Sequence, residues 1–97
     1  MIYHVTTKKI HDAAAQSGFY DAPSLQTEGF IHACSAEQLS GVFERYYPDK
    51  TGLFILHIDE TLLTSLFKYE LAPSVNEMFP HIFGVINNDA VVRVEEL

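Results

Sequence analysis

The second half of the chain consists of short strand-like segments joined by connections too short to hold a helix. Residues 53–58 are apolar except at His57, as is typical of an interior strand. Residues 66–71 alternate in side-chain character, and two further strand-like segments, 82–86 and 90–94, are separated only by a turn. Because parallel neighbours need a long crossover connection, strands joined this closely pair in antiparallel fashion. The pattern therefore predicts a mainly antiparallel β-sheet.

The first half of the chain adds two helices to this sheet. Residues 8–17 place small and apolar side chains at helical spacing after Thr7, a residue type that caps helix N-termini. A second helix is predicted over 36–46, because Ser35 to Gln38 has the form of a capping box and an apolar stripe follows it. Two early helices and a later antiparallel sheet define the α+β class. The other elements expected are strands at 2–6 and 30–34, loops at 19–29 and 73–80, an extended piece at 24–25 and a helical turn at 62–63.

The composition limits what such a protein binds. A length of 97 residues fits one domain, 1–97, and 47% hydrophobic residues suffice for a core. Six Lys and Arg against thirteen Asp and Glu give a net charge of −7, which argues against binding to nucleic acid or to an anionic membrane. No apolar stretch approaches the roughly 18 residues that span a bilayer. Cys34 is the only cysteine, so no internal disulfide forms and we expect a cytoplasmic protein.

Histidines are the polar residues that most need an explanation. His4, His32, His57 and His81 occupy strand-like or proline-flanked apolar segments, where an unpartnered polar group costs about 1–3 kcal/mol. His57 lies in an otherwise apolar strand and is interpreted as structural, while His11 is expected on the exposed face of the first helix. We predict that His4, His32 and His81 converge on one concave site.

His4 and His32 have similar surroundings in the sequence. Each shares a strand face with a small polar side chain two residues on, Thr6 and Cys34 respectively. The second of these strands runs into the capped helix N-terminus at Ser35, whose backbone N–H groups suit an anionic or sugar-phosphate ligand. This arrangement predicts a site for such a ligand.

Two interpretations of Glu70, a carboxylate inside a predicted strand, remain open. It faces the same way as Lys68, so an ordinary surface ion pair explains it. Alternatively, it is a catalytic carboxylate that lies in the histidine site.

Two other kinds of site can be formed from these side chains. Three histidines on different strands can ligate zinc, although no pair has a local ligand spacing such as His-x-x-x-His. Cys34 precedes a helix N-terminus, which would lower its pKa and favour a nucleophile with a histidine partner.

Six segments taken together resemble a known family. They are Ile2–Thr6, Ala22–Leu25, Glu28–His32, Tyr69–Glu70, Phe79–Gly84 and Ala90–Val92. The combination, which covers nearly the whole chain, resembles the small bacterial family catalogued as domain of unknown function 952. That family is grouped by remote similarity with the ADP-ribosyltransferase superfamily. The departures from its pattern are Cys34 and Ser35 in place of Ser and Thr, Tyr69 in place of Trp, and Phe83 and Val85 in place of Tyr and Pro.

The resemblance implies an ADP-ribosyltransferase-like fold, a split mixed β-sheet with a cleft between its halves that binds nicotinamide adenine dinucleotide (NAD). By matching motif, it implies that His4 and Thr6 form the first element of the site. It also implies that His32 is the second element, with Cys34 and Ser35 beside it. These five residues are the predicted nucleotide-binding residues.

The third element of the site is the predicted catalytic one. The resemblance favours Glu70, with His81 as the alternative. The resulting expectation is a domain that binds NAD as a small-molecule substrate and cleaves or transfers at its ribosyl bond, without a metal. The alternative is a non-catalytic module that binds a small molecule or a partner, and a histidine-ligated zinc hydrolase ranks third.

Overall fold

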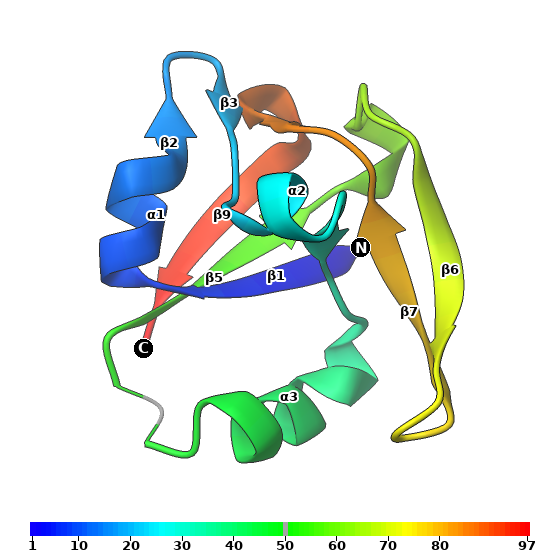
Figure 1. The fold of residues 1–97 in the computed structure, drawn as a ribbon. Helices are drawn as coiled ribbons and strands as arrows, with labels where there is room; N and C mark the ends of the chain where they lie inside the picture. Colours follow the sequence, from blue (N-terminus) through cyan, green and yellow to red (C-terminus); the bar gives the residue numbers. More distant parts are fainter. Residues whose placement is uncertain (50) are drawn as a thin grey trace.

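Nine short strands form three three-stranded sheets in the described part of the protein (Figure 1). The computed structural model describes residues 1–49 and 51–97. The strand orders are β1-β5-β9, β2-β3-β8 and β4-β7-β6, and each pair of neighbours is antiparallel. The α+β class with antiparallel sheets is confirmed, but the parallel pairs of a mixed sheet do not occur among these residues. The strands are β1 (Ile2–Thr7), β2 (Ala15–Gln16), β3 (Phe19–Tyr20), β4 (Ile31–His32), β5 (Leu53–Ile58), β6 (Phe67–Ala72), β7 (Glu77–Ile82), β8 (Ile86–Asn87) and β9 (Val91–Glu96), and the helices are α1 (Lys8–Ala14), α2 (Ser24–Thr27) and α3 (Leu39–Tyr46), with 3-10 helices η1 (Ala36–Gln38), η2 (Glu60–Leu62) and η3 (Asn88–Ala90).

Strand β5 is the centre of the first sheet, as its apolar sequence predicts. It lies between β1 and β9, and four of its six side chains are buried. Its neighbour β1 shows the predicted alternation, with Ile2, His4 and Thr6 buried on one face. His4 is paired with Leu56 of β5, so the imidazole is held on a strand with a fixed register.

A short bridge joins the first sheet to the third. The Tyr3 N–H donates to the Cys34 carbonyl at 2.8 Å, and the Cys34 N–H donates to the Tyr3 carbonyl at 2.8 Å. These two bonds hold the chain just after β4 against β1. As a result, His32 on β4 contacts His4 on β1, although the two are 28 residues apart in the sequence.

Helix α1 is shorter than predicted. The Thr7 hydroxyl oxygen accepts a hydrogen bond from the Ile10 N–H at 3.1 Å, which confirms the predicted N-cap. The helix ends at Ala14 and not at residue 17, because β2 pairs with β3 in a hairpin. Gly18 has a φ of +93°, a conformation that favours glycine, so it belongs to the hairpin turn and not to a helix cap.

Helix α2 replaces the extended piece predicted at 24–25. Pro23 precedes it with a φ of −56° and a ψ of −29°, which is the helical region of backbone space. The N–H groups of Glu28 and Gly29 donate to the Ser24 carbonyl at 2.7 and 3.1 Å. These local hydrogen bonds close a helical turn, and Gly29, with a φ of +88°, then directs the chain into β4.

Strand β7 occupies a segment that the sequence predicts as a loop over 73–80. Pro80 is tolerated in it because β4 pairs only with residues 81 and 82, so the proline lies where that ladder ends. The Pro80 carbonyl still accepts a hydrogen bond from the Ala33 N–H at 3.1 Å.

The strand predicted over 82–86 is interrupted. Ile82 ends β7, and Ile86 begins β8, which pairs with β3 in a different sheet. Both isoleucines are fully buried. The apolar segment therefore reflects burial at two places and not one continuous strand.

The second predicted helix and the predicted helical turn are confirmed with small changes. Residues 36–38 form η1 and continue into α3. The Ser35 N–H donates to Gln38 Oε1 at 2.9 Å, which is the glutamine half of the predicted capping box. Asp59 caps η2. Across the described residues, no helix is both long and apolar enough to cross a membrane.

The core lies where the three sheets meet. Ile31 of β4, Ile58 of β5, Ile82 of β7 and Ile86 of β8 are each 0% exposed and belong to one cluster. Truncating such a buried side chain to alanine costs about 2–5 kcal/mol. The strands that carry the site are thus anchored to one another through packed isoleucines.

Candidate functional site

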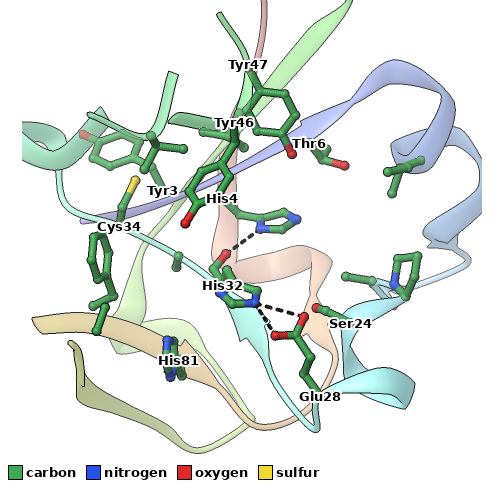
Figure 2. A pocket seen from close by; sticks show the side chains of 18 of the residues that line it. Tyr3, His4, Thr6, Ser24, Glu28, His32, Cys34, Tyr46, Tyr47 and His81 are labelled. Atoms are coloured by element: carbon green, nitrogen blue, oxygen red, sulfur yellow. Dashed lines mark hydrogen bonds and ion pairs between the residues drawn. The ribbon is translucent and has the colours of Figure 1, made fainter. Parts of the chain in front are cut away.

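A cleft of about 680 Å³ lies among β1, β4, β7, α2 and α3 (Figure 2). It brings together His4, His32 and His81, which the sequence predicts to converge. Its buried polar side chains are called the cleft floor here: His4, Thr6, Tyr20 and Cys34. Its acidic and imidazole side chains that are more exposed are called the cleft rim: Glu28, His32 and His81.

Both ring nitrogens of His4 are hydrogen-bonded inside the protein. Its Nδ1 donates to the His32 carbonyl at 2.6 Å, because a carbonyl can only accept. Its Nε2 therefore accepts from the Tyr20 hydroxyl at 3.0 Å. Burial, which disfavours the charged ring, lowers the pKa of His4 from 6.5 to about 4. His4 is thus a neutral imidazole with one defined tautomer, and it joins β1 to β3 and β4.

Tyr20 completes this part of the floor. It lies on β3, is buried, and meets the His4 ring edge-on with 5.3 Å between ring centroids. Burial raises the pKa of Tyr20, and a hydrogen bond with the Thr6 side chain acts in the opposite direction. The phenol therefore stays protonated at neutral pH and donates to His4, while its remaining oxygen lone pair can accept.

The rim contains a histidine–carboxylate pair formed by His32 and Glu28. His32 Nε2 lies 3.1 Å from Oε1 and 3.2 Å from Oε2 of Glu28, so its N–H is shared by both oxygens. The side chains are 55% and 48% exposed, respectively. Figure 2 shows the two facing each other at one side of the cleft, with the His4 ring directed at the His32 carbonyl. Glu28 has the only carboxylate among the described residues that line the cleft.

His81 is the third histidine of the cleft and has its own carboxylate partner. Its Nδ1 lies 2.6 Å from Glu70 Oε1. It is paired with His32 across β4 and β7, with 5.5 Å between the ring centroids, and Phe30 stacks on it at 4.0 Å. An Nδ1–H that donates to Glu70 leaves Nε2 of the neutral ring as an acceptor.

The position of Glu70 agrees with neither of the two interpretations drawn from the sequence, an ion pair with Lys68 or a carboxylate inside the histidine site. It pairs with His81 and not with Lys68, because its carboxylate reaches from β6 to the neighbouring strand β7. It is 46% exposed and does not line the cleft. Among the two predicted catalytic residues, the structure therefore brings His81 to the cleft and places Glu70 behind it.

Cys34 and Ser35 lie in surroundings that the sequence did not predict. Cys34 lines the cleft floor, but burial raises the pKa of its thiol to about 11, so the lowered pKa expected from the helix N-terminus is wrong. Ser35 does not line the cleft, and its N–H is already bonded to Gln38 Oε1. The predicted anion site at this helix start therefore loses its first donor.

Two polar residues that line the cleft, Glu28 and Tyr20, were not predicted as site residues. Glu28 lies four residues before His32, and the turn at Gly29 folds it back beside that histidine. The sequence signal for Glu28 was the segment Glu28–His32, which contains both the glutamate and the histidine. Tyr20 has no comparable signal, because its position is fixed by the pairing of β3 with β2 and with the distant strand β8.

The two remaining histidines lie outside the cleft. His57 Nε2 is 2.9 Å from Glu95 Oε1 of β9 and packs edge-on against Tyr3, which agrees with a structural role. His11 is not on an exposed face as predicted, because its ring packs between Tyr20 and Phe54. In the described part of the chain, no three His, Cys, Asp or Glu side chains are grouped as metal ligands.

The fold and the site define an α+β protein with an aromatic cleft edged by two histidines that are each paired with a glutamate. Residues 5–94 match the family described as Protein of unknown function (DUF952), so the chain belongs to that family, and the resemblance of the sequence to this family, though not to the ADP-ribosyltransferase superfamily, is confirmed. The crystal structure of protein CC0527 from Caulobacter crescentus is similar, with a TM-score of 0.83 at 24% identity, over 99% of this chain and 84% of that one. A double mutant of the same protein has a TM-score of 0.83 at 23% identity, with the same coverage. These two structures share the fold. No curated protein matches the sequence.

Proposed function

We propose that the cleft binds NAD or a related ADP-ribosyl compound and acts on the bond between its ribosyl carbon and its base. The observation that carries this proposal is the position of the Glu28–His32 pair at the edge of a cleft whose floor contains a neutral His4 with both ring nitrogens hydrogen-bonded to protein atoms. A carboxylate at that place can stabilise positive charge that develops on a ribosyl carbon. The family resemblance, which implies a dinucleotide cleft, points to the same chemistry.

The dimensions and lining of the cleft support a small-molecule ligand. Small-molecule sites typically have volumes of about 300–1,000 Å³ and combine apolar walls with a few directed polar groups. The volume here is about 680 Å³, and the lining combines tyrosine, valine, alanine and phenylalanine side chains with the polar floor and rim. Ser24 also lines the cleft and offers a hydroxyl for a ribose.

His4 acts in this proposal by orienting other groups. The resemblance implied that His4 binds the ribose. Because both of its ring nitrogens are hydrogen-bonded to protein atoms, His4 does not bind the ribose directly in this proposal. It aligns the Tyr20 hydroxyl and anchors the His32 backbone, and these neighbours face the ligand. His4 is therefore a positioning residue.

The proposed reaction is hydrolysis or transfer at the glycosidic carbon. The bond between C1′ and the nicotinamide nitrogen breaks, its electron pair stays on that nitrogen, and neutral nicotinamide leaves. The Glu28 carboxylate stabilises the positive ribosyl carbon, and His32 holds that carboxylate. A water oxygen then bonds to C1′ and gives its proton to Nε2 of His81, which passes the proton to solvent.

Glu70 supports this last step from outside the cleft. Its contact of 2.6 Å with His81 Nδ1 keeps the proton on that nitrogen and leaves Nε2 as the base. A base oriented by a carboxylate is a recurring arrangement in hydrolytic sites. Glu70 is thus a positioning residue for His81.

Titration followed by NMR tests the binding step. Addition of NAD is expected to shift the resonances of Ser24, Tyr20 and His32, and to leave those of His57 unchanged, since His57 lies outside the cleft. ADP-ribose and nicotinamide are the partial ligands. If neither NAD nor ADP-ribose moves the cleft resonances, the proposal is wrong.

Release of nicotinamide from NAD tests the chemical step. Release of nicotinamide that is lost when Glu28 is replaced would support the proposed catalytic function. Binding without turnover identifies the cleft as a non-catalytic binding module, which is the alternative expected from the sequence.

A further inference from the structure

We infer that the cleft selects an N-ribosylated aromatic cation through its charged ring and ribose, and that phosphate groups contribute nothing to recognition. This inference rests on the proposed function and specifies which end of the ligand that site recognises. It differs from the expectation of a sugar-phosphate ligand, because the anion-binding groups predicted beside Ser35 are not available in the cleft.

The charge of the cleft supports this inference. Among the described residues that line it, none is Lys or Arg, and Glu28 carries the one formal charge. His32 and His81 are each paired with a glutamate carboxylate, so neither offers an uncompensated positive charge. His4 is held neutral by burial above a pH of about 4, in line with its lowered pKa. The described lining therefore has no net positive charge, and a phosphate finds no counter-charge among those residues.

The aromatic lining supplies what a cationic ring requires. Four tyrosines line the cleft: Tyr3, Tyr20, Tyr46 and Tyr47. Burial raises the pKa of Tyr47, so its ring keeps the neutral phenol form. The faces of such rings attract cations, and the neighbouring Glu28 carboxylate adds direct charge complementarity. An oxidised nicotinamide ring linked to ribose carries one positive charge and fits this environment.

Arg45 is a basic residue next to this lining, adjacent in the sequence to Tyr46. Its guanidinium lies over the Tyr46 ring, 5.8 Å from the centroid, and Arg45 itself does not line the cleft. It is one group through which a phosphate outside the cleft would be recognised if the inference were wrong. Replacing it therefore separates the two possibilities.

Binding measurements with five probes test the inference: nicotinamide riboside, its 5′-phosphate, NAD, dihydronicotinamide riboside and N-methylnicotinamide, the cation methylated on the ring nitrogen. We expect the Kd of the riboside to lie within about threefold of those of the two phosphorylated probes. We expect the dihydro compound, which has nearly the same shape without the charge, to bind about 3- to 30-fold more weakly. Added salt should weaken NAD and the riboside equally, because no phosphate contact is screened.

Two variants and a control complete the test. Tyr46→Leu should weaken the riboside about 3- to 10-fold more than it weakens the dihydro compound. Tyr69→Leu, at an exposed tyrosine of β6, is the control and should change neither. Arg45→Gln should leave the ratio of NAD to riboside affinity unchanged.

The outcomes separate this inference from the proposed function. If the phosphorylated probes bind tenfold or more tightly than the riboside, or if Arg45→Gln selectively weakens NAD, the inference is overturned and the proposed function stands. If N-methylnicotinamide binds but no ribosyl compound does, the proposed function fails and only the preference for an aromatic cation survives. If no probe binds, both fail.

Discussion

At the cleft floor, His4 is 7% exposed and both of its nitrogens are bonded to protein atoms. At the cleft rim, His32 is 55% exposed and only its Nε2 is engaged, by Glu28. The two rings are neighbours, joined through the His32 carbonyl. Their difference shows that burial and partners, more than residue type, decide what a histidine does.

A third histidine sharpens this comparison. His57 pairs with Glu95 at 2.9 Å, much as His81 pairs with Glu70 at 2.6 Å, yet only His81 faces the cleft. A histidine–carboxylate pair is therefore not sufficient to mark a functional site. Its position beside a ligand-sized cavity is the additional requirement.

The largest expected effect is on catalysis at the rim. Glu28→Gln keeps the shape of the side chain but removes the charge, so release of nicotinamide from NAD should fall about 100- to 1,000-fold. Stability should change by less than about 1 kcal/mol, because the pair is exposed. Steady-state turnover and urea unfolding measure the two quantities. Glu95→Gln is the matched control, and equal loss of turnover in both variants would contradict the assignment of Glu28.

At the cleft floor, we expect an effect on stability: acid should lower the free energy of unfolding through His4. The pKa of His4 is lowered by burial from 6.5 to about 4, so between these pH values the unfolded chain binds a proton that the folded protein does not. The free energy of unfolding should therefore decrease as the pH falls from 6.5 to 4, by about 3 kcal/mol for this group, and should be fully retained above that window. Urea unfolding at several pH values measures it.

His4→Asn serves as the comparison for the acid effect. The asparagine amide can still donate toward the His32 carbonyl but does not titrate, so the variant should lose less stability than the wild type between pH 6.5 and 4. Parallel pH profiles for the two proteins would show that His4 is not the source of the acid sensitivity.

The next effect in size tests the hydrogen bond between Tyr20 and His4. Tyr20→Phe keeps the ring but leaves a buried His4 nitrogen without its partner, so the free energy of unfolding should drop by about 1–3 kcal/mol. Tyr69→Phe removes an exposed hydroxyl and should change it by less than about 0.5 kcal/mol. A Tyr20 variant as stable as the wild type would mean that the floor does not depend on this bond.

The smallest expected effect concerns the partner of His81. Glu70→Gln should lower stability by less than about 1 kcal/mol, because the carboxylate is 46% exposed. It should nevertheless change the nitrogen NMR shifts of His81, since the Nδ1–H tautomer loses its charged acceptor. Unchanged shifts would remove the positioning role from Glu70.

Much of the fold could be predicted because its determinants are local. The alternation over 2–6 gives β1 one buried face, the apolar segment at 53–58 gives the interior strand β5, and the capped stripe over 36–46 gives η1 and the partly exposed helix α3, all from short stretches of sequence. Predictions failed where a distant strand decided the outcome. Residues 15–16, predicted as helix, form β2 because they pair with β3. Pro80, predicted in a loop, lies in β7 because β4 ends beside it.

The candidate site divides in the same way. His4, His32 and His81 stand out in the sequence because imidazoles in apolar segments need partners. The identity of those partners depends on register and on tight turns, which single-segment patterns do not contain. Tyr20 therefore emerges only in the folded protein, whereas Glu28 could have been found from the motif that it shares with His32.

The sequence by itself determined the α+β class, the antiparallel pairing and the three histidines, because side-chain periodicity and the cost of burying polar groups act along short stretches of chain. Only the tertiary structure decided that His4 is neutral, that Glu70 pairs with His81 outside the cleft and that burial raises the pKa of the Cys34 thiol. Those properties depend on desolvation and on contacts between residues far apart in the sequence, and both exist only once the three sheets have packed together.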